Sequence, residues 1–423
     1  MLNSPRLPGS SPARTPWRAA IRAVTLVAVL ASLAGLTATA AEAQGRRARL
    51  STDLAARLAA GDRSGVDVFV AGASSRLERI AARHGLRVKK ALTGGAVLEV
   101  PAGGLDALAA DPEVDALVAD ADVRSHLALT TATTGAEQVW RGLAEGLGRA
   151  TGRGVGVAVI DSGIAPHLAV GFRVVASVDF TSRRGRGLDQ YGHGTHVGGI
   201  IAGQAIRVGR TSAAAGMAPG AHLVNLKVLD ADGAGKASSV VEAIDWAIQY
   251  KDRFAIRVIN LSLGAPVTAR CADDPLCSAV ERAVRAGLVV VASAGNYGQT
   301  ADGKTVLGSI TSPGNSPYAI TVGALWTQGT VDRGDDEVAP WSSRGPTLFD
   351  GVVKPDLVAP GSRIVSAIGP GATLARQYPD RLVSGRGAHG YFEMSGTSMA
   401  AAAVSGAAAL LLEAQPALTP LQV

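Results

Sequence analysis

The chain has 423 residues, of which 47% are hydrophobic and 18% are charged, and its formal net charge is +6. This length predicts two or three folding units, and the hydrophobic content excludes a chain that is disordered throughout. The positive charge does not predict nucleic-acid binding, because four arginines lie within the first 22 residues and no basic cluster interleaved with aromatic residues follows them.

The N-terminal segment has the pattern of a secretory signal. Arginines precede an apolar run at residues 24–36, and Ala41-Glu42-Ala43 offers a small-x-small cleavage site. We therefore predict a signal peptide at residues 1–43 and a secreted protein, extracellular or periplasmic. The alternative is a membrane anchor, but a run of 13 apolar residues is shorter than the ~20 that span a bilayer. We expect no stable membrane anchor.

Residues 44–126 are expected to form a small unit of their own. Strand patterns at residues 66–70, 87–91, 96–100 and 114–118 alternate with helical spacing at 75–84 and 105–109. This β–α–β–β–α–β order is that of a ferredoxin-like α+β unit. The Thr-rich stretch 129–135 then predicts a linker at the start of the remaining part, residues 127–423.

The pattern changes from about residue 154 onwards. Continuous apolar runs predict strands at 155–160, 222–228, 257–263, 288–292 and 318–322, and helical spacing predicts helices at 194–203, 238–250 and 276–286. Strands that are buried on both faces predict an α/β fold, in which a mainly parallel sheet is sandwiched by helices. Functional side chains then belong at the carboxyl ends of the strands.

Two candidate residues come first along this part of the chain. Asp161 follows the apolar run 157–160, where an aspartate is as often a turn cap as a catalyst. His193 stands between two glycines, which allow other groups to approach its ring closely. Because His193 and His196 lack the i, i+4 spacing and the glutamate of a metalloprotease helix, we predict no metal site there. His193 is the expected general base, and His196 a structural neighbour.

Cys271 and Cys277 are the only cysteines in the chain. Export would place them in an oxidising compartment, so we predict that they form a disulfide. The alternative is a pair of metal ligands, but no further cysteine and no nearby histidine completes a zinc set.

Asn296 and Ser398 are the last two candidates. Asn296 follows an apolar strand and Ala294-Gly295, where it is either a turn residue or a donor to a developing negative charge. Ser398 precedes an Ala-rich helical stretch, and a serine at a helix start is commonly only an N-cap. The same position also supplies unpaired backbone amides that favour an oxyanion.

Taken together, these segments resemble the signature blocks of the subtilase family. The blocks are VAVIDSGI around Asp161, GHGTHVGGI around His193, SAGN ending at Asn296 and SGTSMA around Ser398, in that order. Further similar stretches begin at Ala215, Val258 and Ser342, so the resemblance extends from about residue 135 to the C-terminus. It implies a secreted serine endopeptidase with an Asp161–His193–Ser398 triad and Asn296 as an oxyanion donor.

The resemblance also implies how a substrate is held. Ser262-Leu263-Gly264 and the segment containing Gly233 and Gly235 resemble the two strands that bind an extended peptide through backbone hydrogen bonds. Ala294-Gly295 would line the wall of the pocket for the residue before the cut. The expected partners are protein or peptide substrates, and the enzyme is expected to be a monomer.

Residues 44–126 resemble the family's pro-region, an intramolecular inhibitor that assists folding. The resemblance implies autoprocessing between about residues 122 and 134, near His126. The chemistry needs no cofactor, whereas the family often binds structural calcium, for which the sequence identifies no ligands.

Two departures from the family pattern stand out. Residues 369–392 look inserted relative to compact members and predict a surface loop near the site. The family pattern also continues past Val423, which predicts that the sequence is truncated at its C-terminus.

Three other functions each predict a sequence feature that differs from this chain. An α/β-hydrolase esterase would need a G-x-S-x-G motif, which does not occur. A carboxyl-type serine peptidase would have glutamate where His193 stands. A catalytically silent binding protein should have lost one of the four catalytic residues, and all four are present.

Overall fold

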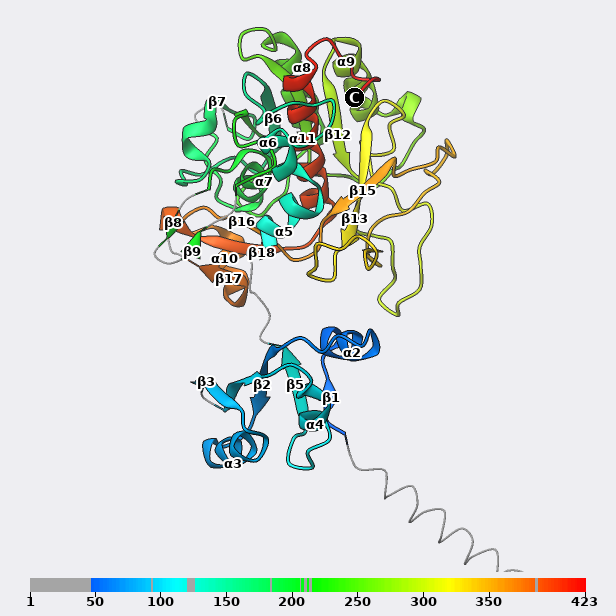
Figure 1. Ribbon diagram of the computed structural model, residues 1–423. Helices are drawn as coiled ribbons and strands as arrows, with labels where there is room; N and C mark the ends of the chain where they lie inside the picture. The colour runs from blue at the N-terminus through cyan, green and yellow to red at the C-terminus, as the bar shows by residue number, and fades with distance from the viewer. Residues whose placement is uncertain are drawn as a thin grey trace, which may run out of the picture. The chain divides into compact units, whose positions relative to one another are not determined.

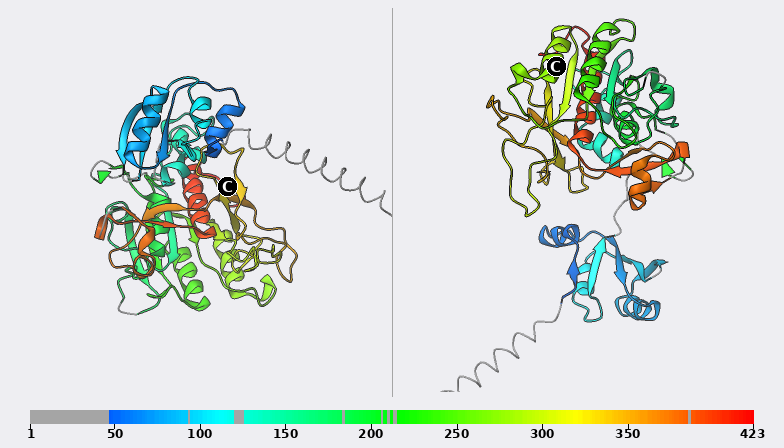
Figure 2. Two further views of the ribbon diagram at one scale, coloured as in Figure 1. Left: turned by 90° about the horizontal axis from the view of Figure 1, so that it is seen from below. Right: turned by 180° about the vertical axis from the view of Figure 1, so that it is seen from behind.

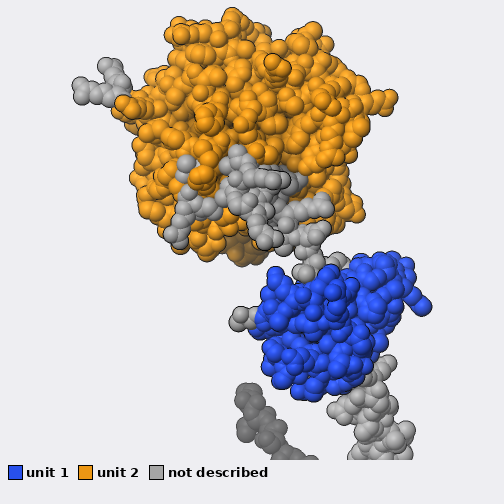
Figure 3. Space-filling model, turned by 60° about the vertical axis from the view of Figure 1, so that its left-hand side comes forward, with its two compact units in different colours: residues 1–123 blue, residues 124–423 orange. Residues whose placement is uncertain are grey.

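The computed structural model describes residues 47–92, 94–119, 126–182, 185–205, 207–208, 211–212, 215–384 and 387–423. The chain divides into two compact units, residues 1–123 and residues 124–423, which are coloured separately in Figure 3. The predicted signal peptide, residues 1–43, lies outside the described residues, as does the part of the predicted processing region between residues 122 and 125.

The first unit is a five-stranded sheet with helices. Its elements are β1 (Arg49–Leu50), α2 (Thr52–Ala59), β2 (Val66–Ala71), α3 (Ser74–His84), β3 (Arg87–Leu92), β4 (Gly95–Val100), α4 (Leu105–Ala109) and β5 (Ala116–Ala119). The strand order is β1-β5-β2-β4-β3, in which only the β1–β5 pair is parallel. Leu77 and Ile80 of α3 pack with Val68 and Leu98 of the sheet to form a separate core.

The second unit is built on an eight-stranded sheet (Figure 1). Its strands are β6 (Gly156–Asp161), β7 (Val174–Asp179), β10 (His222–Lys227), β11 (Ile256–Leu261), β12 (Val289–Ser293), β13 (Ile320–Trp326), β14 (Glu337–Val338) and β15 (Leu357–Pro360). The order is β14-β13-β12-β11-β6-β10-β7, with β15 also beside β13, and only the β13–β14 pair is antiparallel. The predicted mainly parallel α/β sheet is confirmed.

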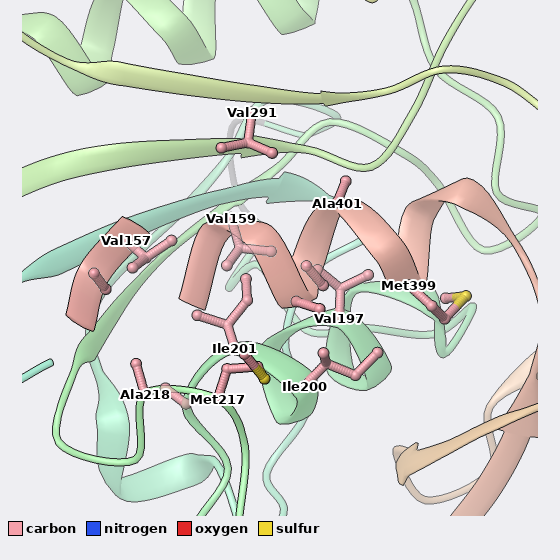
Figure 4. Packing of buried hydrophobic residues seen from close by; sticks show 14 of the residues in the cluster. Val157, Val159, Val197, Ile200, Ile201, Met217, Ala218, Val291, Met399 and Ala401 are labelled. Atoms are coloured by element: carbon pink, nitrogen blue, oxygen red, sulfur yellow. The ribbon is translucent and has the colours of Figure 1, made fainter. Parts of the chain in front are cut away.

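Helices cover both faces of this sheet. The long helices are α7 (His193–Ala202), α8 (Ala237–Gln249), α9 (Pro275–Arg285) and α11 (Thr397–Ala414). Along β6, Val157 and Val159 belong to the core formed with α7 and α11, whereas Ala158 and Ile160 belong to the core formed with α8 and α9. Figure 4 shows the first of these cores. The alternation explains why residues 157–160 of this strand are all apolar, since side chains of a strand point to opposite faces in turn.

The Thr-rich stretch predicted as a linker is instead helical. It lies in α5 (His126–Thr133), which is followed by α6 (Ala136–Arg141). Threonine is a poor helix former, but Leu129, Thr130, Thr131 and Thr133 are buried, and packing of these side chains outweighs their weak intrinsic preference.

The predicted surface loop at residues 369–392 is also more ordered than expected. It contains α10 (Thr373–Gln377), a 3-10 turn at Pro379–Arg381 and β17 (Leu382–Ser384), and it leads into β18 (Tyr391–Met394). With β16 (Ile364–Ala367), these strands form a sheet of order β16-β18-β17, drawn in orange in Figure 2. Phe392 anchors the segment because its side chain is only 1% exposed.

A few short elements complete the second unit. β8 (Arg207–Val208) pairs with β9 (Thr211–Ser212), and 3-10 turns occur at Gly171–Arg173, Cys271–Asp273 and Gly387–His389. The Cys271–Cys277 disulfide predicted from the sequence is present at the start of α9, with Cα atoms 5.4 Å apart. Among the described helices, α11 alone has the length and hydropathy of a membrane span, and 67% of it is buried inside the protein, as is usual for a core helix.

Candidate active site

Asp161 is the last residue of β6 and lies at the carboxyl edge of the parallel sheet. Its side chain is fully buried, and Oδ1 accepts a hydrogen bond from the Ser162 amide at 2.7 Å. β6 lies between β10 and β11 in the sheet order. The carboxylate therefore stands at the middle of the sheet edge where ligands bind in folds of this kind.

His193 is the first residue of α7 and faces Asp161. Its Nδ1–H donates to Asp161 Oδ1 at 2.8 Å and Oδ2 at 3.0 Å. A β-carbon on Gly194 would lie 2.2 Å from the Gly163 carbonyl oxygen, so only glycine allows α7 to start so close to the turn after Asp161. Burial opposes protonation of the ring, but the Asp161 charge outweighs it and raises the pKa of His193. With Nδ1 donating, Nε2 is left as the basic nitrogen.

Asp189 organises this corner of the site, although no sequence motif singled it out. Its side chain is buried, and Oδ1 accepts from Ser162 Oγ at 2.9 Å and from the Gly192 amide at 2.7 Å. Oδ2 accepts from the amide and hydroxyl of Thr195 at 2.8 and 2.6 Å. One carboxylate thus satisfies otherwise unpaired amides at the start of α7 and ties the helix to the residue after Asp161. Its only sequence signal is a polar residue four positions before His193.

Ser398 is the second residue of α11 and is linked to Ser262. The Ser398 hydroxyl donates to the Ser262 carbonyl at 3.0 Å, and the Ser262 hydroxyl donates to the Ser398 carbonyl at 2.8 Å. Within the described part of the chain, Ser398 makes no hydrogen bond to His193. The sequence-predicted residues therefore form two groups in this structure: Asp161 with His193, and Ser398 with Ser262 and its neighbours.

Asn296 belongs to the second group. Its Oδ1 accepts from the amide and the hydroxyl of Thr397 at 3.0 and 3.1 Å. Because Oδ1 accepts both of these hydrogen bonds, the other terminal atom of the side-chain amide is the donor Nδ2. A β-carbon placed on Gly396 would lie 3.5 Å from Asn296 Nδ2 and 3.7 Å from the Ser398 amide nitrogen, so these two donors border the same small space. Two converging N–H groups beside a serine are the arrangement that stabilises an oxyanion.

The two predicted substrate segments lie at exposed chain edges. Leu263 and Gly264 continue from β11, and Gly264 is exposed. Gly233 and Gly235 lie in a turn after β10 that closes with an antiparallel bridge between Leu229 and Gly235. Gly233 has φ +78°, and a β-carbon there would lie 2.6 Å from the ring of Tyr191, two residues before His193.

Ala294 and Gly295 follow β12. Thr311 lies between Gly295 and Gly264 and is close to both. A β-carbon on Gly264 would lie 2.4 Å from Thr311 Oγ1, and one on Gly295 would lie 2.8 Å from Thr311 Cγ2. Thr311 is 4% exposed, and its amide donates to the Ala294 carbonyl at 3.0 Å. Sequence analysis missed this residue, because it lies in a loop without a motif.

His196 is the structural neighbour that the sequence predicts. Its ring is completely buried, and Nε2–H donates to the carbonyls of Phe392 at 3.0 Å and Ile364 at 3.2 Å. Nδ1 has no hydrogen-bond partner in the described residues. Burial lowers the pKa of His196 to about 3, so the ring is neutral at physiological pH.

In the described ranges, no group of three or more His, Cys, Asp or Glu side chains is arranged to hold a metal ion.

Comparison with known proteins agrees with the resemblance found in the sequence motifs. The model of the subtilase family matches residues 152–423. Serine protease AprX of Bacillus subtilis (strain 168) is 41% identical over 281 residues, which are 64% of this chain and 60% of that protein. An extracellular serine proteinase of Thermus sp. (strain Rt41A) is 35% identical over 360 residues, covering 83% and 75% of the two chains. Among solved structures, Sphericase is similar with a TM-score of 0.51 and 30% identity, covering 64% of this chain and 81% of that one.

Proposed function

Because this chain belongs to the subtilase family, we propose that it is a secreted serine endopeptidase that cleaves peptide bonds through Asp161, His193 and Ser398. The chain spans 60% of the length of AprX, so the activity proposed here is that of the catalytic unit. The observation that carries the proposal is the buried Asp161–His193 pair at the same sheet edge as Ser398, whose amide borders one space with Asn296 Nδ2.

Acylation begins with a change of hydrogen-bond partner. The Ser398 hydroxyl leaves the Ser262 carbonyl, to which it donates in the free enzyme, and turns towards Nε2 of His193. His193 takes the hydroxyl proton while Oγ attacks the substrate carbonyl carbon, and the electrons of the C=O bond move to the oxygen. Asp161 holds the Nδ1–H and stabilises the imidazolium that forms.

The negative oxygen is held by Asn296 Nδ2 and the Ser398 amide. When the intermediate collapses, the C–N bond breaks, His193 gives its proton to the leaving amine, and an ester to Ser398 remains. Water then repeats the sequence with His193 as base, releases the acid and returns the proton to Ser398. Every group in this cycle belongs to the chain, and subtilases need no cofactor for catalysis.

The substrate is proposed to bind in extended form between residues 262–264 and 233–235. Both segments offer backbone groups at an exposed edge, so the peptide adds to them as a strand. Ala294 and Gly295 line the pocket for the residue before the cut, and Thr311 limits the pocket between Gly264 and Gly295. We therefore expect small and medium-sized apolar side chains at that position.

The first unit is proposed to be a pro-region that inhibits the second unit until the second unit cuts it off. Residues 1–43 would direct export, in agreement with the name of the extracellular proteinase from Thermus. We propose a monomeric mature enzyme whose partners are protein or peptide substrates and its own pro-region, without nucleic acid or a membrane anchor.

Two variants test the proposed processing. Ser398→Ala removes the nucleophile with little change in volume, so the protein should fold and the pro-region should stay attached. Asn296→Ala keeps the nucleophile but should slow processing by about a hundred- to a thousandfold, a magnitude known from subtilisin itself. The measurement is N-terminal sequencing after expression in a host without other exported proteases. Normal cleavage of Ser398→Ala would show that another protease does the cutting.

A catalytically silent binding protein is the alternative function. It would keep the fold but would not react with a fluorophosphonate probe, which labels an activated serine. The proposal therefore expects the processed wild type to be labelled and Ser398→Ala to remain unlabelled. Absence of labelling in both proteins would favour the binding function.

A further inference from the structure

A cavity lies next to Asn296, one of the two proposed oxyanion donors. Its volume is about 390 Å³, and it is lined by Asn296, Trp341, Arg381, Glu393 and Ser395. Arg381 ends the 3-10 turn at Pro379–Arg381, within the stretch that the sequence marks as inserted, and precedes β17, which is labelled in Figure 1. The inserted segment therefore contributes a cation to a cavity that also borders the catalytic Asn296.

The two charged groups of this cavity are not equivalent. Glu393 already has a cationic partner, because Arg363 Nε lies 3.3 Å from its Oε1. Arg381 lies over the ring of Tyr378 at 4.7 Å, and in the described part of the chain no carboxylate is within ion-pair distance of it. The cavity thus presents one uncompensated positive charge.

Two further groups complement an acidic side chain. Ser395 Oγ accepts a hydrogen bond from the Arg363 amide at 2.8 Å, and its own O–H has no acceptor in the described residues, so it can donate to a ligand. Trp341 is partly buried and offers an apolar surface for methylene groups. A cation, a hydroxyl donor and an aromatic surface together match a short side chain that ends in a carboxylate.

The position of the cavity determines which part of the substrate reaches it. The segment before the cut is assigned to residues 262–264 and 233–235, and none of these residues lines the cavity. Asn296 and Ser395 do line it, so the cavity lies beyond the oxyanion donors, on the side of the leaving amine. In an extended peptide, the first residues after the cut are the ones within reach.

We propose that this cavity is a subsite for aspartate or glutamate at one of the first two positions after the cleaved bond, with Arg381 as the specificity-determining residue. The proposal rests on the endopeptidase function proposed above. It adds a preference that the inserted segment confers on the reaction.

The test uses the processed enzyme and quenched fluorescent peptides with identical residues before the cut. The residue at each of the two following positions is Glu, Gln or Lys in turn, and mass spectrometry verifies the cleaved bond. An exposed ion pair predicts that kcat/KM for Glu exceeds that for Gln by about two- to fivefold, with Lys lower still. The preference should shrink as NaCl is raised, because salt screens exposed charges.

Variants then assign the preference to one side chain. Arg381→Gln should abolish the difference between Glu and Gln, and Arg381→Glu should reverse the order of Glu and Lys. Arg376→Gln is the matched control, because Arg376 belongs to the same segment but its guanidinium is engaged with the Gly371 carbonyl and Thr373 Oγ1. The control should keep the wild-type preference.

A peptide p-nitroanilide, which has no residue after the cut, separates the two proposals. Equal cleavage of this substrate by all variants shows that they fold and that the catalytic groups work. If it is cleaved but the peptides show no charge preference, or Arg376→Gln changes the preference as much as Arg381→Gln does, the subsite is refuted and the endopeptidase function stands. If no variant and not even the wild type cleaves it, the proposed function itself fails.

Discussion

Replacing His196 by glutamine should reduce the loss of unfolding free energy that the second unit suffers on acidification. The His196 ring must be neutral in the folded protein, because it is buried, its Nε2–H donates to two carbonyls and its pKa is about 3. In the unfolded chain the pKa is near 6.5. Between these two values the unfolded state binds the extra proton, so stability falls as pH falls through this window.

The size of the effect follows from the two pKa values. The difference between the folded and unfolded pKa values lowers the unfolding free energy by about 5 kcal/mol at a pH where His196 is protonated in both states, at about 1.4 kcal/mol per pKa unit. Between pH 7 and pH 5 the loss is about 2 kcal/mol. Glutamine at position 196 retains an N–H donor of similar reach but cannot take up a proton. The variant is expected to be less stable than the wild type at pH 7 and to lose about 2 kcal/mol less on going to pH 5.

The assay is urea unfolding at pH 7 and pH 5 in a Ser398→Ala background, which prevents self-digestion. Tryptophan fluorescence reports on the second unit, because Trp140, Trp246, Trp326 and Trp341 all lie in it, and the fifth tryptophan, Trp17, belongs to the predicted signal peptide that export removes. Carboxylates also contribute to acid unfolding, but they contribute equally to both proteins. A loss of stability that is the same in both proteins would refute the assignment of the pH dependence to His196.

Three further predictions concern the same unit. Because Asp161 raises the pKa of His193, the acidic limb of the kcat/KM profile should lie above pH 6.5, and a limb at lower pH would contradict this. Asp189→Asn should leave an amide of α7 without an acceptor and lower the unfolding free energy by about 1–3 kcal/mol, which thermal melts measure. It should also move the acidic limb of the kcat/KM profile to lower pH, because it removes a negative charge near His193. An unmoved limb would show that Asp189 only supports the helix. Replacing Cys271 by Ser together with Cys277 by Ala should cost about 2–3 kcal/mol for so short a loop, and equal urea midpoints of oxidised wild type and variant would rule this out.

Much of the second unit could be predicted because its local patterns agree with its tertiary structure. Residues 157–160 of β6 and 289–292 of β12 are all apolar, and both faces of the sheet are covered by helices. The motifs around Asp161, His193 and Ser398 place these residues at a strand end and at two helix starts, where the structure has them. The substrate and catalytic roles of the candidate residues stay predictions that the proposed variants can test.

Other features depended on contacts that no local pattern reveals. The threonines of α5 are helical because they are buried, and β17 exists because it pairs with β18. Asp189 and Thr311 lie in loops, and their importance comes from hydrogen bonds or close approach to residues that are distant in the sequence. Such residues become visible only when the chain is folded.

The helices that carry His193 and Ser398 are tightly packed, both against each other and against neighbouring residues. α7 packs against α11, and a β-carbon on Gly406 of α11 would lie 2.4 Å from Met217 Cβ and 3.3 Å from the Ile201 carbonyl of α7. Figure 4 shows Met217 and Ile201 beside α11. The separation of His193 and Ser398 is thus set by tight core packing, which is not readily deformed. A side chain at Gly406 would therefore push α11 away from Met217 and from the Ile201 carbonyl of α7, and would move Ser398 relative to His193.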